Sequence, residues 1–283
     1  MIRLIAFDMD GTLLTDDKEI SEKTLEALGR ARDMGIHLVP TTGRPMDGAE
    51  PYLDQIPGVR YVITCNGAGI YDWEKGTCIH RDAMELDYYL PMLRELNKLH
   101  LMADSFVDGG ALMNRDRAYM IDGIATNEAT KDYIRTSRKL VDDQEEYLRK
   151  TGKPVEKLTV NFVVDESGHR VDFQAARDLL EKYPQVNPVS GGMHNIEVTK
   201  KDVTKATGLA WLGKKLGIGP EEMMAFGDSG NDAAMLSYVG LGIAMGNSED
   251  LAIEAAKETT ASNMEDGIAV SLTKYLWPQS SEA

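Results

Sequence analysis

The sequence contains few cysteines, no long apolar run and no recognisable leader segment, and each shortage excludes a class of protein. Only Cys65 and Cys78 occur among the 283 residues, so a disulfide framework is implausible and both thiols fit a reducing compartment. No apolar run approaches the roughly 18 residues that a membrane-spanning helix needs. The opening, MIRLIAFDMD, lacks the apolar core and cleavage site of a signal peptide. We therefore expect a cytoplasmic protein.

Basic residues and paired histidines are also scarce. The chain has 31 Lys and Arg against 46 Asp and Glu, a formal net charge of −15, which argues against nucleic acid or an anionic membrane as a partner because neutralising phosphates takes clustered positive charge. The five histidines show no HxH or HxxxH spacing, so a histidine-based metal site is not expected. A small anionic substrate remains compatible with this charge, since one metal ion and one lysine can reverse the local field.

Short apolar runs alternate with helical patterns in both end regions of the chain. Runs typical of buried strands occupy residues 4–7, 36–39, 61–64, 223–226 and 241–245. Helical periodicity or caps mark residues 21–34, 204–216, 231–238 and 248–257. Because alternating strands and helices build a parallel sheet covered by helices, we predict an α/β fold with a Rossmann-like core made of residues 1–82 and 193–283.

The middle of the chain has a different pattern. A helix is predicted at 85–100, a hairpin at 101–114, a polar charged segment at 127–153, an alternating strand at 155–164 and a helix near 170–182. Alternation predicts a strand with one face in water, which is typical of antiparallel sheets. We therefore predict that residues 83–192 form an antiparallel α+β domain inserted into the core.

Polar residues follow several strands of the predicted core. Ligands of an open parallel sheet bind beyond the carboxyl ends of its strands, so we expect these residues to converge if the strands share one sheet. Gathered carboxylates need a cation or proton to neutralise them, and oxygen ligands of this kind suit Mg²⁺. The residues concerned are Asp8, Asp10, Thr42, Asn66, Asp228 and Asp232.

Two other interpretations of the first aspartate pair were weighed. A twelve-residue calcium loop from Asp8 to Glu19 would want glycine at its sixth position and a helix before it, whereas Leu13 stands there and a strand precedes. A plain structural turn would explain one DxDG alone, but the second acidic motif, GDSGND at 227–232, argues against it.

Four short segments of the sequence together resemble the four motifs of the haloacid dehalogenase superfamily of phosphotransferases. They are DMDGTLL at 8–14, TGR at 42–44, a lysine further on and GDSGND at 227–232. The resemblance covers nearly the whole core. Three further features resemble those of the Cof-type subfamily, which carries a large α+β cap of the C2B type between its second and third motifs. They are the place and length of the insertion, NGA at 66–68 and SNMEDGIA at 262–269.

The resemblance implies a role for each matching residue. Asp8 would be the nucleophile that forms an aspartyl phosphate. Asp10 would be the acid that protonates the leaving alcohol and then the base that activates water. Thr42 would hydrogen-bond a phosphoryl oxygen. Lys205, in the first turn of its helix and at the family spacing, would balance charge on the nucleophile and the phosphoryl group; it is preferred for this over Lys200, Lys201, Lys214 and Lys215.

The same resemblance implies a Mg²⁺ site in which Asp228 binds the ion with Asp8 and the carbonyl of Asp10, while Asp232 holds the surroundings of the metal. Gly11 lets the backbone turn tightly so that loop amides can face the phosphate. Further residues expected at the phosphate are Gly43, Arg44, Asn66 and Asn231. A surface charge would explain Arg44 and a turn asparagine would explain Asn66 equally well, whereas Asn231 is expected rather to support the surroundings of the metal.

The function implied is Mg²⁺-dependent hydrolysis of small phosphomonoesters, with sugar phosphates as the leading class. The alternatives are a phosphomutase or phosphotransferase of the same fold, and a regulator that binds a phosphorylated ligand without turnover. We expect a small-molecule substrate, and the cap should close over the site. His194, Asn195 and the hairpin around 104–115 are the expected lining of the cap.

Overall fold

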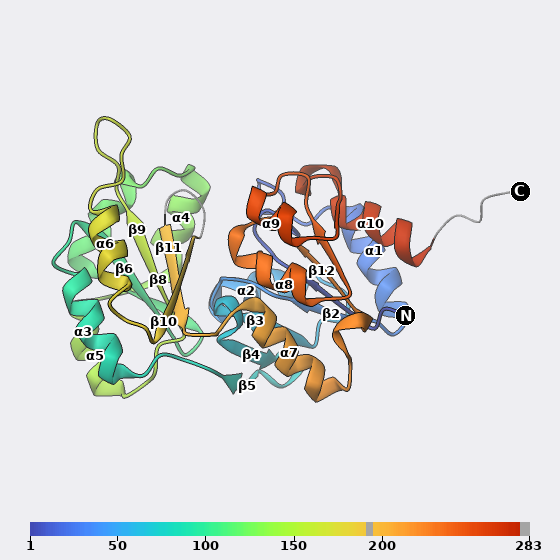
Figure 1. The fold of residues 1–283 in the computed structure, drawn as a ribbon, viewed down its shortest axis with the longest axis horizontal. Coiled ribbons are helices and arrows are strands. Elements are labelled where there is room, and N and C mark those ends of the chain that lie inside the picture. The colour runs from blue at the N-terminus through green and yellow to red at the C-terminus, as the bar shows by residue number, and fades with distance from the viewer. Residues whose placement is uncertain (191–194, 278–283) are drawn as a thin grey trace, which may run out of the picture. The chain divides into compact units, whose positions relative to one another are not determined.

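The computed structural model describes residues 1–190 and 195–277, which form two compact units. Unit 1 comprises Met1–Gly43, Ala49–Ile79 and the chain from Thr204 onward, and unit 2 comprises Arg44–Gly48 and His80–Val203. Figure 1 shows the elements of each unit in chain order. The predicted helix-and-sheet core with an inserted domain is therefore present, and His194 lies outside the described residues.

Unit 1 contains a five-stranded parallel sheet in the order β14-β13-β12-β1-β2. The central strand β1 (Leu4–Phe7) is buried along its length and pairs with β12 (Met223–Gly227) and β2 (His37–Pro40). The outer strands are β13 (Leu241–Ala244) and β14 (Glu258–Thr259). The predicted strands 4–7, 36–39, 223–226 and 241–245 are confirmed to within one residue at either end, because a continuous apolar run suits a strand covered on both faces.

The strand predicted at 61–64 does not join this sheet. β3 (Tyr61–Thr64) pairs antiparallel with β4 (Gly69–Asp72), and a three-stranded sheet is completed by β5 (Thr77–Arg81). The chain reverses direction at Cys65–Gly67, where Cys65 and Asn66 adopt left-handed backbone angles of 48° and 56° in φ. A single parallel bridge between Thr41 and Ile63 links β3 to the end of β2, so the carboxyl end of β3 still lies beside that of β2.

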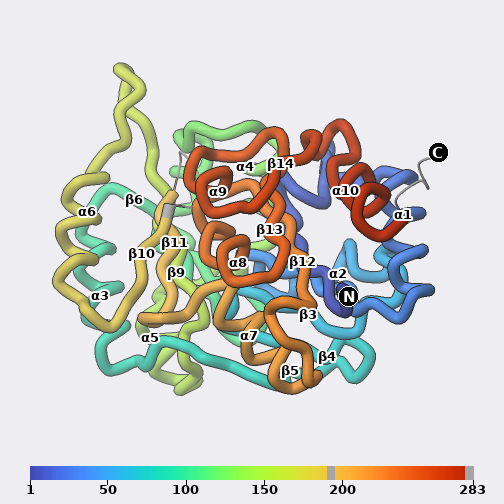
Figure 2. The backbone as a smooth tube through the Cα atoms, turned by 45° about the vertical axis from the view of Figure 1, so that its right-hand side comes forward, coloured from blue at the N-terminus to red at the C-terminus, as the bar shows by residue number. Residues whose placement is uncertain are grey.

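Helices flank the parallel sheet of unit 1. α1 (Glu22–Asp33) begins after Ser21, whose side chain accepts a hydrogen bond from the Thr24 amide, and α7 (Lys205–Leu216) begins after the capping residue Thr204. In Figures 1 and 2, α1 and α10 lie side by side. The predicted helix 231–238 divides into a 3₁₀ turn and a helix, and the predicted helix 248–257 begins after Glu249 rather than at Ser248. The remaining helices are α2 (Met46–Leu53), α8 (Ala233–Tyr238), α9 (Asp250–Ala255) and α10 (Gly267–Leu276).

Unit 2 is built on a six-stranded sheet in the order β10-β11-β9-β6-β7-β8. The predicted hairpin is confirmed: β6 (Leu101–Val107) and β7 (Gly110–Asn114) are joined by Asp108 and Gly109, both with positive φ, as a two-residue hairpin turn requires. The sheet is not wholly antiparallel as predicted, because β7 pairs in parallel with β8 (Arg138–Val141). The other strands are β9 (Lys157–Phe162), β10 (Val186–Ser190) and β11 (Asn195–Lys200).

The two faces of this sheet differ in composition. α3 (Leu86–Leu96), α5 (Gln144–Thr151) and α6 (Phe173–Leu180) cover an apolar face made by residues such as Leu101, Leu158 and Val198. On the other face, methionines and isoleucines of the 3₁₀ segment Arg115–Gly123 and of α4 (Glu128–Ser137) pack around Met102 and Met113. The rest of that face is mostly polar, and it includes the buried ring of Phe106 beneath Arg138 and Lys157. We predicted that the polar side of strand 155–164 is solvated, but Lys157, Thr159 and Asn161 are buried.

The division between the units differs from the predicted boundaries. Residues 195–203 group with unit 2 rather than with the core, because β11 pairs with β9 and β10 in the six-stranded sheet. Residues 44–48 also group with unit 2, where the Asp47 amide donates to the Gly109 carbonyl at 2.9 Å. Within the part of the chain that the structure describes, no helix has the length and apolar character to cross a membrane.

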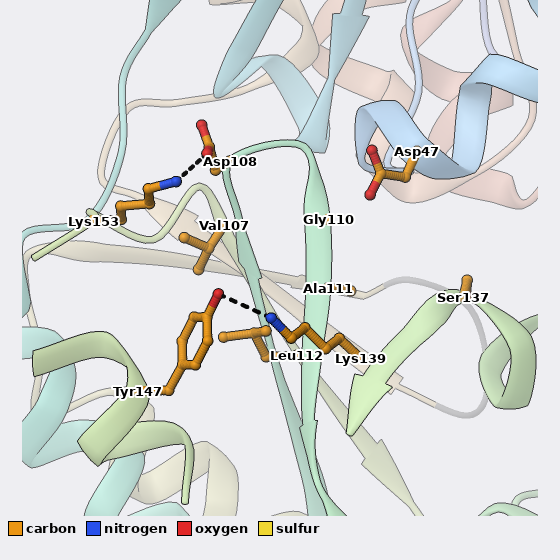
Figure 3. Close-up of a pocket in the computed structure, with 10 residues that line it drawn as sticks. All are labelled: Asp47, Val107, Asp108, Gly110, Ala111, Leu112, Ser137, Lys139, Tyr147 and Lys153. Carbon is orange, nitrogen blue, oxygen red and sulfur yellow. Dashed lines mark hydrogen bonds and ion pairs between the residues drawn. The ribbon is translucent and has the colours of Figure 1, made fainter. Parts of the chain in front are cut away.

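Unit 2 contains a cavity of about 220 Å³ beside the β6–β7 turn. Figure 3 shows Lys139 pointing toward the Tyr147 hydroxyl and Lys153 toward Asp108. The Lys139–Tyr147 distance is 3.4 Å, and Lys153 forms an ion pair with Asp108. Asp108 therefore neutralises Lys153, whereas the partner of Lys139 is a neutral hydroxyl and does not compensate its charge.

The turn Cys65–Gly67 should be essential for stability, and Gly67→Ala tests this. Gly67 has a φ of +103°, and an added Cβ would lie 2.1 Å from the Thr204 carbonyl oxygen at the start of α7. We expect the substitution to lower the free energy of unfolding by about 3 kcal/mol or more, measured by urea denaturation. Gly76→Ala is the matched control: its φ is +60° with nothing within 4 Å of the added carbon, so backbone strain alone should cost about 1–2 kcal/mol. Equal losses for the two variants would contradict the close contact.

Candidate functional site

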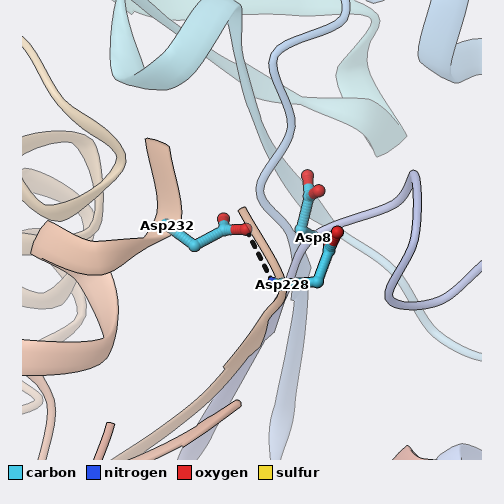
Figure 4. Close-up of side chains that lie close together, drawn as sticks. All are labelled: Asp8, Asp228 and Asp232. Carbon is cyan, nitrogen blue, oxygen red and sulfur yellow. Dashed lines mark hydrogen bonds between the residues drawn. The ribbon is translucent and has the colours of Figure 1, made fainter. Parts of the chain in front are cut away.

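Three aspartates converge at the carboxyl ends of β1 and β12. Asp8, Asp228 and Asp232 each offer a carboxylate oxygen within 4.8 Å of the others, as Figure 4 shows. β1 and β12 are neighbouring parallel strands, and the Asp8 amide donates to the Phe226 carbonyl at 3.0 Å. Adjacent strands therefore bring together residues 220 positions apart in the sequence, as the strand-end pattern predicts.

Lys205 lies between two of these carboxylates. Its Nζ is 2.7 Å from Asp8 Oδ1 and 2.6 Å from Asp232 Oδ1, and its side chain is fully buried. The residue occupies the first position of α7, which the Thr204 cap and the contact with Gly67 hold in place. A buried ammonium is stable only when paired, so this lysine and the two carboxylates are mutually dependent.

Asp232 uses both of its oxygens within the protein. Oδ1 accepts from Lys205, while Oδ2 accepts from the amides of Asp228 and Ser229 at 3.0 and 3.1 Å. These bonds close the loop after β12 and orient the Asp228 side chain. Asp232 is therefore better suited to holding the loop and the lysine than to direct metal binding.

Burial and mutual repulsion shift the ionisation of the cluster. Burial raises the pKa of Asp228 to about 7, with a further increase from Asp232, and the Thr12 hydroxyl and Lys205 oppose the shift only in part. Burial likewise raises the pKa of Asp8 well above its ordinary value, although Lys205 counteracts it. Burial lowers the pKa of Lys205, but Asp232 and Asp8 outweigh that effect and the net pKa is raised. Three carboxylates surround one lysine, so the cluster carries an excess of negative charge. Its oxygen donors and this charge fit a divalent cation.

The loop after β1 packs tightly against Asp228. Gly11 has a φ of +78°, and a Cβ there would lie 2.4 Å from Asp228 Oδ2. Thr12 donates from its hydroxyl to Asp228 Oδ1 at 2.7 Å. Thr12 was not predicted from the sequence as a site residue; its position directly after DxDG is the signal that could have identified this contact.

Asp10 belongs to the same loop but is not one of the three clustered carboxylates. Its Oδ1 is 2.8 Å from Lys18 Nζ, and its side chain is 39% exposed. The partial exposure leaves the carboxyl accessible for exchange of a proton, in contrast to buried Asp8. Lys18 was not identified from the sequence, because a lysine in a polar loop gives no signal of its partner.

Thr42 and Asn66 lie side by side where β2 and β3 end. The Thr42 amide donates to the Ile63 carbonyl at 2.9 Å, and the Thr42 carbonyl accepts from the Asn66 amide at 3.0 Å. The competing residue, Thr41, donates its hydroxyl to the Val39 carbonyl at 3.1 Å. Asn66 Oδ1 in turn accepts from Asn231 Nδ2 at 3.2 Å.

Gly43 and Arg44 lie at the division between the compact units. Gly43 is half-buried at the end of a segment of unit 1. Arg44 is buried in unit 2, where its guanidinium donates to the Gly48 carbonyl at 3.0 Å and lies 4.6 Å above the Tyr133 ring. These contacts give Arg44 a packing role that sequence reasoning did not foresee.

Two asparagines from the C-terminal part support the loop after β1. Asn247 donates to the Gly11 carbonyl at 2.8 Å, and Asn263 donates to the Leu14 carbonyl at 2.9 Å. The Asn263 amide also donates to Asn247 Oδ1 at 3.0 Å. Asn263 belongs to SNMEDGIA, so the motif that supported the resemblance also holds the loop after β1.

Comparison with known proteins shows the family of the chain. The family model of haloacid dehalogenase-like hydrolases matches residues 5–272. A 5-amino-6-(5-phospho-D-ribitylamino)uracil phosphatase of Bacillus subtilis is 31% identical over 283 residues, which cover 96% of this chain and 97% of the relative.

Solved structures show the same architecture. A haloacid dehalogenase-like hydrolase from B. subtilis superimposes with a TM-score of 0.84 at 25% identity, covering 97% of this chain and 100% of the other. A sugar phosphatase of haloacid dehalogenase subclass IIB superimposes with a TM-score of 0.77 at 25% identity, covering 96% and 98%. The chain therefore belongs to the haloacid dehalogenase-like hydrolases, in the Cof-type group with an inserted cap, and is a phosphoric monoester hydrolase.

Proposed function

We propose that the protein hydrolyses small phosphomonoesters, sugar phosphates among them, with Mg²⁺ as cofactor and Asp8 as the covalent nucleophile. The observation that carries the proposal is the placement of Lys205 Nζ between Asp8 Oδ1 and Asp232 Oδ1 at 2.7 and 2.6 Å, beside buried Asp228. A fixed positive charge next to a buried carboxylate is what a nucleophile needs to approach an anionic phosphoryl group.

The donor set supports Mg²⁺ as the cofactor. Asp8 and Asp228 would hold the ion together with the carbonyl of Asp10, since hard oxygen donors are the ligands that Mg²⁺ prefers. When bound, the ion supplies positive charge to the phosphoryl oxygens. Asp232 would support the site through its bonds to the Asp228 and Ser229 amides and to Lys205.

We assign each chemical step of the proposed reaction to a residue. Lys205 engages Asp8 Oδ1, so we assign the attack on phosphorus to Oδ2, with the bond from phosphorus to the ester oxygen breaking as the bond to Oδ2 forms. Asp10 donates a proton to the departing oxygen, then accepts one from the water that attacks the aspartyl phosphate and releases inorganic phosphate. Lys18, 2.8 Å from Asp10, would position that carboxyl.

The remaining polar residues would bind the phosphoryl oxygens. The Thr42 hydroxyl would donate to one oxygen, and backbone amides after Gly11 would face another, because a tight turn presents consecutive N–H groups to an anion. Asn66 and Asn231 already contact each other and would fix the shape of the site at this end. Gly43, which directly follows Thr42, would let the chain pass close to the phosphate, and Arg44 would act through packing.

The names of the relatives support a small phosphorylated substrate. One relative acts on a phosphoribitylamino compound and one structural neighbour is a sugar phosphatase. Both names describe a phosphate carried on a polyhydroxylated chain or ring, which makes sugar phosphates and polyol phosphates the first substrates to assay.

Asp8→Asn should abolish hydrolysis while the fold is retained. An amide cannot form the acyl phosphate, so we expect phosphate release from p-nitrophenyl phosphate to fall at least about 1,000-fold, with an unchanged circular dichroism spectrum. Asp17→Asn, at an exposed position of the loop after β1, is the matched control and should retain full activity. Turnover by Asp8→Asn close to that of the wild type would contradict the covalent mechanism, and an isomerised sugar phosphate in place of free phosphate would indicate a mutase.

Removal of divalent cations should destabilise the protein more at pH 8 than at pH 6. The pKa of Asp228 is raised to about 7 in the folded, metal-free protein, so the stability contributed by its protonated form is present at low pH and is lost as the pH rises through about 7. Above that pH the ionised cluster depends on the cation. We expect the increase in Tm on replacing EDTA with MgCl₂ to be larger at pH 8. An increase that is equal at both pH values, or larger at pH 6, would contradict this assignment.

A further inference from the structure

A groove runs between α1 and α10 on the surface of unit 1. The two helices lie side by side, as Figures 1 and 2 show, and the groove between them has a volume of about 470 Å³. Ala27 of α1 and Ala269 of α10 line it, and these small side chains leave the space between the helices open. All of its lining residues belong to unit 1.

Contacts along the groove show that the two helices run in the same direction. At their amino ends, Lys23 Nζ lies 3.2 Å from Asp266 Oδ2. At their carboxyl ends, the Arg30 guanidinium lies 3.9 Å from the centre of the Trp277 ring, and Trp277 Nε1 donates to Met34 Sδ at 3.2 Å. Because the helices are parallel, the groove has a direction, with distinct amino and carboxyl ends.

Exposed apolar side chains follow the groove along its length. Met264 lies just before α10, Val270 lines the groove and Met34 directly follows α1, with exposed fractions of 53%, 51% and 52%. Single exposed apolar side chains are ordinary, but several that follow one groove favour an interaction surface. Methionine, tryptophan and arginine are also enriched where proteins meet, and Trp277 and Arg30 stack at the carboxyl end.

The charges of the groove are divided between its two ends. Lys23 is paired with Asp266. Glu26 forms no ion pair within the part of the chain that the structure describes, and Arg30, one helical turn further along α1, contacts the Trp277 ring rather than a carboxylate. Glu265 adds a second acidic group near the amino end. The amino-terminal half is therefore negative and the carboxyl-terminal half positive.

This charge order restricts what covers the groove. A complementary partner must present positive charge opposite the amino end and negative charge opposite the carboxyl end. A second copy of the chain does so when a two-fold axis reverses the direction of its helices. With the axis near the middle of α1, Glu26 of one copy faces the partner's Arg30, and Val270 lies close to the axis. The opposed helix dipoles are then also favourable.

We propose that two copies of this chain associate through the α1–α10 groove in this antiparallel arrangement. The inference does not depend on the proposed hydrolase activity. α1 has 12 residues and is thus about 18 Å long, and packed helices lie about 8–10 Å apart. A face of two such helices is smaller than the roughly 800 Å² per partner of a standard interface, so the dimer is weak, with a dissociation constant of about 10–100 μM.

Sedimentation velocity on the full chain over a range of concentrations tests the association. The wild type should shift from monomer to dimer between about 1 and 200 μM. Val270→Arg places two like charges near the axis, so the dissociation constant should rise at least about 10-fold, with an unchanged circular dichroism spectrum. Leu251→Arg is the matched control: Leu251 is 58% exposed on α9 and does not line the groove, so this variant should dimerise like the wild type.

A mixing experiment tests the two-fold arrangement itself. Arg30→Glu places two acidic side chains opposite each other at both ends of the dimer, and Glu26→Arg places two basic ones there. Each variant alone should associate about 10-fold more weakly than the wild type. In an equimolar mixture of the two, every facing pair has opposite charges, so dimers containing one copy of each variant should form and should be detected by native mass spectrometry.

Three results would overturn the proposal. The first is a wild type that stays monomeric up to about 200 μM, above the expected dissociation constant. The second is a dimer that Val270→Arg and the two charge variants leave as stable as before, because its interface then lies elsewhere. The third is a mixture of Arg30→Glu and Glu26→Arg that associates no better than either variant alone, which is incompatible with Glu26 facing the partner's Arg30.

Discussion

The buried ion pairs of Lys205 are the contacts on which the rest of the catalytic unit depends. One ammonium lies within 2.7 Å of Asp8 and of Asp232 with no exposure to solvent. Removing a charge from water costs several kcal/mol unless paired partners compensate, so neither the lysine nor the carboxylates can be buried alone. The arrangement requires α7 to begin at a fixed place relative to β1 and β12, which explains the close contact between Gly67 and the Thr204 carbonyl.

The same arrangement separates two aspartates that look equivalent in DMDGTLL. Asp8 is buried beside Lys205 with a raised pKa, whereas Asp10 is 39% exposed and lies 2.8 Å from Lys18. A nucleophile benefits from a fixed position and exclusion of water, and a group that exchanges protons benefits from access to solvent. The different surroundings of the two residues are therefore consistent with the two different roles proposed for them.

Much of the core could be predicted from the sequence because its signals are local. Apolar runs that end in polar residues identified β1, β2, β12 and β13, and the adjacent placement of β1 and β12 explains why Asp8 and Asp228 meet. β3 was assigned to the wrong sheet because the turn Cys65–Gly67 decides its pairing. A cysteine and an asparagine adopt left-handed backbone angles there, and no sequence pattern predicted them. Thr12 was missed although its place directly after DxDG marked it, and Lys18 was missed because its partner is visible only in three dimensions.

The errors in unit 2 have one physical origin. Alternation of polar and apolar residues in β9 indicated a strand with one solvated face, yet Lys157, Thr159 and Asn161 are buried. Alternation in a sequence indicates that the two faces of a strand differ in polarity. It does not indicate that the polar face is exposed to solvent. A buried polar face is costly unless its groups are paired. Asp104 Oδ2 and Glu197 are paired, whereas Asp104 Oδ1 and Thr159 Oγ1 have no hydrogen-bond partner among the residues that the structure describes. The polar face of β9 is therefore buried at an energetic cost that its own hydrogen bonds offset only in part, which is why alternation alone could not predict its burial.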